Sequence, residues 1–155
     1  MSGSRHTVVV LSELADDDPE ADLDLHRWER LAAAALEVER APTGELNLLF
    51  VDEYVMTQLN IEHMEGEGPT DVLAFPIDAD DALEGGLPVL LGDIVICPAV
   101  ARRYAAEHGV ALVDELALLV VHGVLHILGH DHAEPEETAY MKEREQALLA
   151  AHHGP

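Results

Sequence analysis

Apolar residues in the first two thirds of the chain fall into short runs, rich in valine, leucine and isoleucine, that are typical of strands. Four such runs predict strands at His6–Ser12, Glu45–Val51, Val72–Phe75 and Val89–Ile96. Pro76 ends the third run, because proline has no N–H for a sheet. Segments 65–71 and 78–88 hold mainly Gly, Asp and Glu, and we expect loops there.

A helical period replaces this pattern elsewhere in the chain. Leu25, Trp28, Leu31 and Leu36 share one face of a predicted helix over residues 22–40, which places Trp28 in the core. Capping residues, prolines and glycines indicate where four more predicted helices begin and end, at 52–63, 98–108, 113–128 and 134–151. This order predicts one α+β domain over residues 1–155, with a small mixed four-stranded sheet packed with about five helices.

Composition limits the classes of protein to consider. The chain has 155 residues, which suits a single domain, and its 31 acidic against 8 basic residues give a formal net charge of −23. Such a field repels polyanions and also suits a high-salt host. One cysteine, Cys97, allows no internal disulfide, and no secretion signal or membrane-length apolar run is present. We therefore expect a cytoplasmic protein.

The segment HGVLHILGHDH, residues 122–132, has the spacing HxxxHxxGxxH. On a helix, His122 and His126 lie on one face, one turn apart, so both imidazoles can reach a single ion. Gly129 can adopt the left-handed conformation that turns the chain and returns His132 to the pair. Three imidazoles leave the fourth tetrahedral position of a zinc ion for water, as in catalytic zinc sites.

The same spacing occurs in metzincin proteases, but Gly123 stands where those enzymes carry their glutamate base. Peptide hydrolysis needs that base, because the leaving amine must be protonated. Phosphodiester cleavage depends on it less, since zinc itself lowers the pKa of a bound water to about 7 and stabilises charge on a phosphoryl oxygen. The pattern therefore favours a zinc-dependent phosphodiester hydrolase over a peptidase. Histidines that merely pack in an apolar helix are the structural alternative.

Segment 122–132 also resembles the signature H-G-x-L-H-x-x-G-x-D-H of the bacterial YbeY family. Three further blocks resemble the family in the same order: Leu59-Asn60, PTDVLAFP at 69–76 and LGDIVIC at 91–97. The resemblance covers the chain apart from its divergent N-terminal third. It implies that His122, His126 and His132 hold one Zn²⁺ per chain.

The family resemblance implies an activity and partners. It implies an endoribonuclease for single-stranded RNA that matures the 3′ end of small-subunit ribosomal RNA and takes part in ribosome quality control, with zinc-bound water as the attacking group. The implied partners are ribosomal RNA and the small ribosomal subunit with its proteins, and neither DNA nor a membrane is expected. A second interpretation stays open: a ribosome-assembly factor whose zinc stabilises the fold and whose nuclease activity is small.

Few cations are available to bind RNA. The family arginine that follows the Leu-Asn pair is absent, and Ile61 stands directly after it. His63, Arg102 and Arg103 are the remaining candidates for phosphate contacts, each with a solvated surface side chain as the alternative.

Two residues of the motif could lie just outside the metal ligands. Asp131 can accept the second N–H of a ligand imidazole, or it can cap the turn. His130 can neighbour the metal or lie exposed on the surface.

Overall fold

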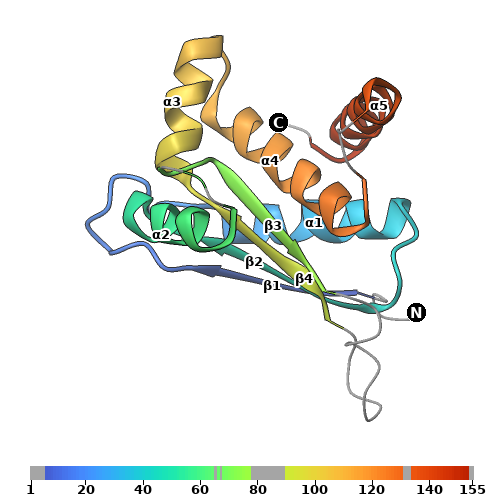
Figure 1. The fold of residues 1–155 in the computed structure, drawn as a ribbon, viewed down its shortest axis with the longest axis horizontal. Helices are drawn as coiled ribbons and strands as arrows, with labels where there is room; N and C mark the ends of the chain where they lie inside the picture. The colour runs from blue at the N-terminus through green and yellow to red at the C-terminus, as the bar shows by residue number, and fades with distance from the viewer. Residues whose placement is uncertain (1–5, 65, 67, 78–89, 131–133, 154–155) are drawn as a thin grey trace.

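The computed structural model describes residues 6–64, 66, 68–77, 90–130 and 134–153. These residues form a mixed sheet covered by helices (Figure 1), which confirms the predicted α+β class. The elements, in chain order, are β1 (His6–Ser12), α1 (Leu25–Val38), β2 (Gly44–Phe50), α2 (Glu53–Met64), β3 (Val72–Pro76), β4 (Leu90–Ile96), α3 (Pro98–His108), α4 (Leu112–Ile127) and α5 (Pro135–His152).

The four strands lie in the order β1-β2-β4-β3. The first three run parallel, and β3 pairs antiparallel with β4, with Ala74 opposite Ile94. Within the described sheet β3 is therefore an edge strand, and it contacts α4. The PTDV block leads into this edge strand and so lies next to the histidine helix.

Alternation along β4 divides the core between the two faces of the sheet. Ile94 and Ile96 join a large hydrophobic cluster with α1, α4 and α5, in which Trp28 is 2% exposed, as its position in the helical period predicted. Val95 and Cys97 join a smaller cluster beneath α2. The apolar helix α4 therefore rests on the sheet, and its histidines are carried by a well-packed element.

Local capping sets where the first helices begin. Asp24 accepts a hydrogen bond from the backbone N–H of Arg27, so α1 begins at Leu25 rather than at the predicted residue 22. Asp52 caps α2 as predicted, because its carboxylate accepts the N–H of Val55 at 2.9 Å.

The last described residue, His153, ties the end of α5 to two other helices. Its ring nitrogens lie 2.8 Å from Arg27 at the beginning of α1 and 2.8 Å from Asp114 at the beginning of α4. In the described part of the chain, no single helix has the length and apolar character to span a membrane; α3 and α4 qualify only as a pair, bent by 117°.

Candidate metal site and its clefts

His122 and His126 lie together on α4, as their spacing predicted. Their ring centroids are 4.7 Å apart, with the planes inclined by 72°. His132 and Asp131 lie outside the described residues, and within the described part no three His, Cys, Asp or Glu side chains form a group that could hold a metal. The structure therefore describes two of the three predicted ligands, next to each other on one helix.

The turn after α4 has the glycine conformation expected from the motif. Gly129 has φ +97°, and its N–H bonds to the carbonyl of His126 at 3.0 Å. The N–H of His130 bonds to the carbonyl of Leu125 at 3.0 Å, which completes a Schellman motif. A side chain at position 129 would strain this turn, so glycine directs the chain away from the helix just before the third predicted ligand.

The structure shows a packing requirement for glycine at position 123, which the sequence did not show. A Cβ atom there would lie 2.7 Å from Cγ2 of Ile94, closer than side chains tolerate. Helix α4 therefore approaches β4 at a point where a larger residue does not fit. A glutamate at this position would have to displace Ile94 or shift α4, so the base of the protease motif does not fit this packing.

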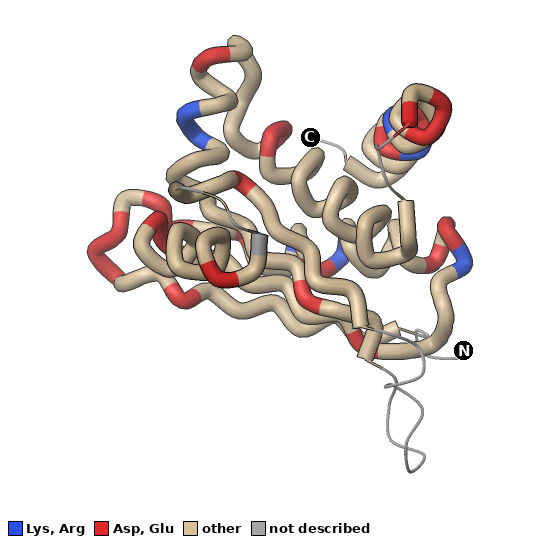
Figure 2. Tube along the Cα trace, viewed as in Figure 1, with Lys and Arg blue, Asp and Glu red and all other residues tan. Residues whose placement is uncertain are grey.

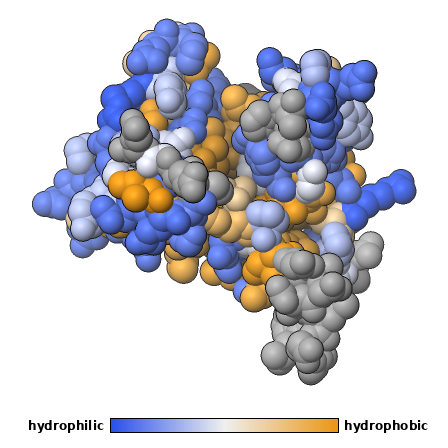
Figure 3. All heavy atoms as spheres, in the orientation of Figure 1, coloured by the Kyte–Doolittle hydropathy of each residue, from blue (hydrophilic) through white to orange (hydrophobic). Residues whose placement is uncertain are grey.

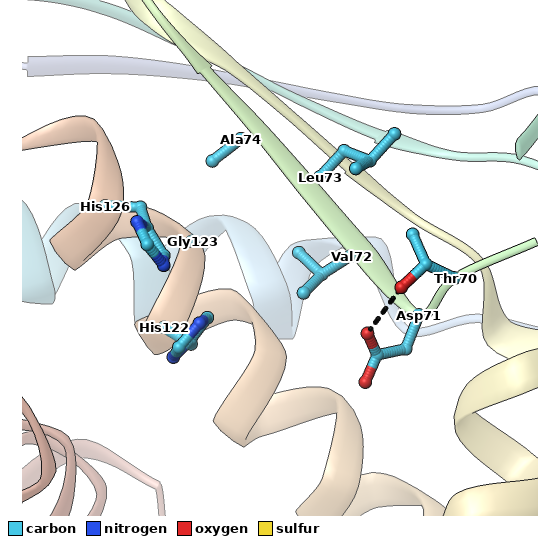
Figure 4. A pocket seen from close by; sticks show the side chains of 8 residues that line it. All are labelled: Thr70, Asp71, Val72, Leu73, Ala74, His122, Gly123 and His126. Carbon is cyan, nitrogen blue, oxygen red and sulfur yellow. Dashed lines mark hydrogen bonds between the residues drawn. The ribbon is translucent and has the colours of Figure 1, made fainter. Parts of the chain in front are cut away.

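The histidine pair lines a cleft of about 390 Å³ between α4 and the edge strand β3 (Figure 4). Val72 and Ala74 point from β3 toward α4, whereas Leu73 points to the other side of the sheet. The side chains of Thr70 and Asp71 stand at one end of the cleft, joined by a hydrogen bond of 3.4 Å. In Figure 3 this part of the surface is a hollowed apolar band between more hydrophilic lobes.

A buried carboxylate from α5 contacts His122, one member of the histidine pair. Nδ1 of His122 donates to Oε2 of Glu145 across 2.5 Å, and Glu145 is 7% exposed. Sequence reasoning missed this residue. The available signal was its position on the buried stripe of α5, between Met141 and Leu148, where an apolar side chain is expected.

A second cleft of about 280 Å³ opens between α4 and α5. It is lined by His122, Thr138, Met141, Lys142 and Glu145. Among the described residues of the two clefts that share His122, Lys142 is the only Lys or Arg. A cation therefore shares this cleft with His122, at the α5 side.

The two arginines predicted as phosphate contacts are engaged by carboxylates. Arg102 forms two hydrogen bonds with Glu20, at 2.7 and 2.9 Å, and lines a different cavity from the histidines. Arg103 bonds to Glu53 at 2.7 Å. The carboxylate partner offsets the charge of each arginine and so weakens its attraction for a phosphate.

The two predicted histidine contacts have separate surroundings. The ring of His63 meets Phe75 edge-on, with centroids 5.3 Å apart, and its side chain is 51% exposed. His130 stacks on Tyr140 with centroids 5.5 Å apart, and its Nε2 lies 3.8 Å from Glu39. His130 is therefore only partly exposed, and it connects the turn after α4 to the end of α1 and to α5.

The Leu-Asn block has a structural role at the end of α2. The amide of Asn60 donates to the carbonyl of Gly68 at 2.7 Å, and its backbone carbonyl accepts the N–H of Gly66. These bonds hold Gly66 and Gly68 against the end of α2. The asparagine of the block therefore fixes two described residues that precede Thr70 and Asp71 in the chain.

The electrostatics near the Asp71 end of the cleft are unfavourable for anions. Burial raises the pKa of Glu115, in the first turn of α4, and the charge of Asp71 raises it further. Figure 2 shows Asp and Glu on many peripheral segments and Lys and Arg at few positions. This end of the cleft is therefore the less suitable one for a phosphate group.

Comparisons with known proteins agree with the motifs. The family described as "Endoribonuclease YbeY" matches residues 13–153. A Salinispora tropica protein named "Endoribonuclease YbeY" is 47% identical over 140 residues, covering 84% of this chain and 89% of its own length. One of the same name from Thermobifida fusca is 46% identical over 134 residues, covering 82% and 84%.

A solved structure supports the fold independently. The solution structure of a Thermotoga maritima protein aligns with a TM-score of 0.59 at 23% identity, covering 94% of this chain and 91% of the other. With the family match over most of the chain and relatives above 40% identity, the sequence resemblance is confirmed. The chain belongs to the YbeY family.

Proposed function

We propose that this protein is a zinc-dependent endoribonuclease that cuts single-stranded RNA during maturation of small-subunit ribosomal RNA. The relatives' name supports the endoribonuclease activity. The observation that carries the metal dependence is the pair His122 and His126, whose rings lie side by side at the wall of a cleft. His132 is proposed as the third ligand, because the Gly129 turn ends just before it.

The ligand chemistry fits zinc. Neutral imidazoles are common zinc ligands, and a set of three leaves a coordination position for water. Zinc, when bound, lowers the pKa of that water to about 7 and stabilises negative charge on a phosphoryl oxygen. The chain's own part is to hold the imidazoles on a buried helix, to bring the RNA backbone to the cleft and to limit the access of bulk water.

The charges around the two clefts suggest how RNA approaches. Asp71 and Glu115 disfavour phosphate at one end, whereas Lys142 stands at the α5 side of His122. We therefore place a phosphate near Lys142, with the cleaved bond over the histidine pair. Lys142→Gln should raise KM for a short RNA severalfold with little change in kcat, because a single exposed contact positions substrate more than it stabilises the transition state.

Cleavage of a labelled single-stranded RNA tests the proposed activity. Wild-type protein should cut it, chelator should stop cleavage, and added zinc should restore it. His126→Ala should lose cleavage, which excludes a contaminating nuclease. Casein, under the same conditions, should remain intact. Cleavage that survives both chelator and His126→Ala would contradict the proposal.

The ribosome-assembly factor remains the second candidate. The pairing of Arg102 and Arg103 with glutamates and the net charge of −23 favour it, because both reduce affinity for free RNA. Normal zinc content without cleavage of RNA, either free or within small ribosomal subunits, would select this candidate.

A further inference from the structure

The buried carboxylate of Glu145 needs a hydrogen-bonding partner to offset the free energy that it loses on leaving water. Glu145 lies on the buried stripe of α5, next to Met141 and Leu148, which are 2% and 1% exposed. Moving a carboxylate from water into such surroundings is unfavourable unless hydrogen bonds compensate. The compensating partner is a ring nitrogen of His122, on another helix and 23 positions away in the chain.

The contact also fixes which nitrogen of His122 carries hydrogen. A carboxylate can only accept a hydrogen bond, so Nδ1 of His122 donates to Glu145. In the neutral ring Nε2 then has the lone pair, and the ring cannot rotate without breaking the bond of 2.5 Å. Ligand histidines in metal sites commonly hold a carboxylate through their second nitrogen in this way.

We propose that Glu145 is a positioning residue for the metal: it holds the His122 ring with hydrogen on Nδ1 and presents Nε2 to the ion beside His126. This inference rests on the proposed zinc site. It assigns to Glu145 the role that the sequence had offered to Asp131, and it makes α5 part of the metal site. Glu145 increases the affinity for metal without contacting it.

Two substitutions separate this role from ordinary packing. Glu145→Gln keeps the shape and an acceptor oxygen but removes the charge, and Glu145→Leu keeps the bulk and removes the acceptor. Glu143→Gln, on the exposed side of the same helix, is the matched control. If the pair only packed α5 on α4, the substitutions would change the melting temperature and leave zinc affinity of the folded protein unchanged.

Competition with a chromophoric chelator measures the zinc dissociation constant of each folded variant. We expect about 10- to 100-fold weaker binding for Glu145→Leu, a smaller loss for Glu145→Gln and no change for Glu143→Gln. In zinc-free protein, nitrogen NMR of the histidine rings should find hydrogen on Nδ1 of His122 in the wild type and a loss of that preference in Glu145→Leu.

The outcomes distinguish the two proposals. Wild-type zinc affinity in both Glu145 variants would overturn the positioning role and leave the zinc site intact. A wild-type protein that binds no zinc would overturn the zinc site and this role together. If Glu145→Leu does not fold, Glu145→Gln decides alone, through its affinity and its ring-nitrogen spectrum.

Discussion

Gly123 shows how one small residue affects both packing and chemistry. It lets α4, the helix that carries His122 and His126, approach Ile94 of β4 closely. It also removes the base used by the protease version of the motif. At this position, the packing of the core accounts for the glycine that replaces that base.

Gly123→Ala is expected to destabilise the protein by about 1 kcal/mol. Alanine favours a helix by about 1 kcal/mol, but overpacking a core costs about 1–3 kcal/mol. The added Cβ would lie 2.7 Å from Ile94. Urea unfolding measures the change, and Gly68→Ala, whose Cβ would meet nothing within 4 Å, is the control. Equal or greater stability for Gly123→Ala would show that Ile94 moves aside easily.

Cys97 gives a prediction about pH. The side chain is 0% exposed, and burial raises the pKa of its thiol above the ordinary value. The native protein should therefore react slowly with iodoacetamide between about pH 7 and 9, and rapidly once unfolded in urea. Because the thiolate is disfavoured in the folded state, folding stability should fall as pH rises above the ordinary thiol pKa. Rapid labelling of native protein at about pH 7 would contradict this.

Sequence spacing alone identified the residues whose relation is local. His122 and His126 share one helix, and Gly129 follows them directly, so helical geometry was sufficient to bring them together. Glu145 was not predictable in this way, because its contact depends on how α5 packs against α4. Its one signal was a charged residue on an apolar stripe.

At the scale of elements, order and type were predicted because strand and helix periods differ clearly. The pairing β1-β2-β4-β3 could not be read from the chain, since it depends on contacts between distant strands. The same limitation applies to Arg102 and Arg103: their glutamate partners lie before α1 and at the beginning of α2, and only the assembled fold brings them together.

Metal removal should loosen the turn after α4 more than it unfolds the protein. The two hydrophobic clusters do not include the histidine pair, so the core can persist without an ion. Hydrogen exchange with and without chelator should show faster exchange in peptides that cover residues 126–134 and little change in β2 and β4. Loss of most helical circular dichroism in the zinc-free protein would instead indicate a structural metal and favour the assembly factor.

For the whole molecule, the dominant property is its negative charge of −23. Among the described residues that line the two clefts sharing His122, only Lys142 is a Lys or Arg. These clefts therefore offer few positive charges to neutralise the phosphates of RNA. We propose that the ribosome supplies the positive surface, through a basic protein of the small subunit, and presents the RNA to the cleft. The acidic exterior would then assist docking.

Free RNA should therefore bind weakly, and its affinity should depend little on salt. The logarithm of the binding constant falls with the logarithm of the salt concentration by a slope of about −0.7 for each phosphate contact to a single strand, and few such contacts are available. Filter binding at several salt concentrations measures this. Precursor RNA within small ribosomal subunits should be cleaved faster than the same RNA stripped of protein. Tight binding of free RNA, with equal cleavage in both contexts, would mean that a local basic surface outweighs the net charge.

The most direct test of the zinc site is the metal content of purified protein, determined by elemental analysis. Wild-type protein and His130→Ala should each contain one zinc per chain. His122→Ala, His126→Ala and His132→Ala should each lose most of it, because two imidazoles alone hold zinc poorly. Full zinc content in all three variants would contradict the assignment of these histidines as the ligands.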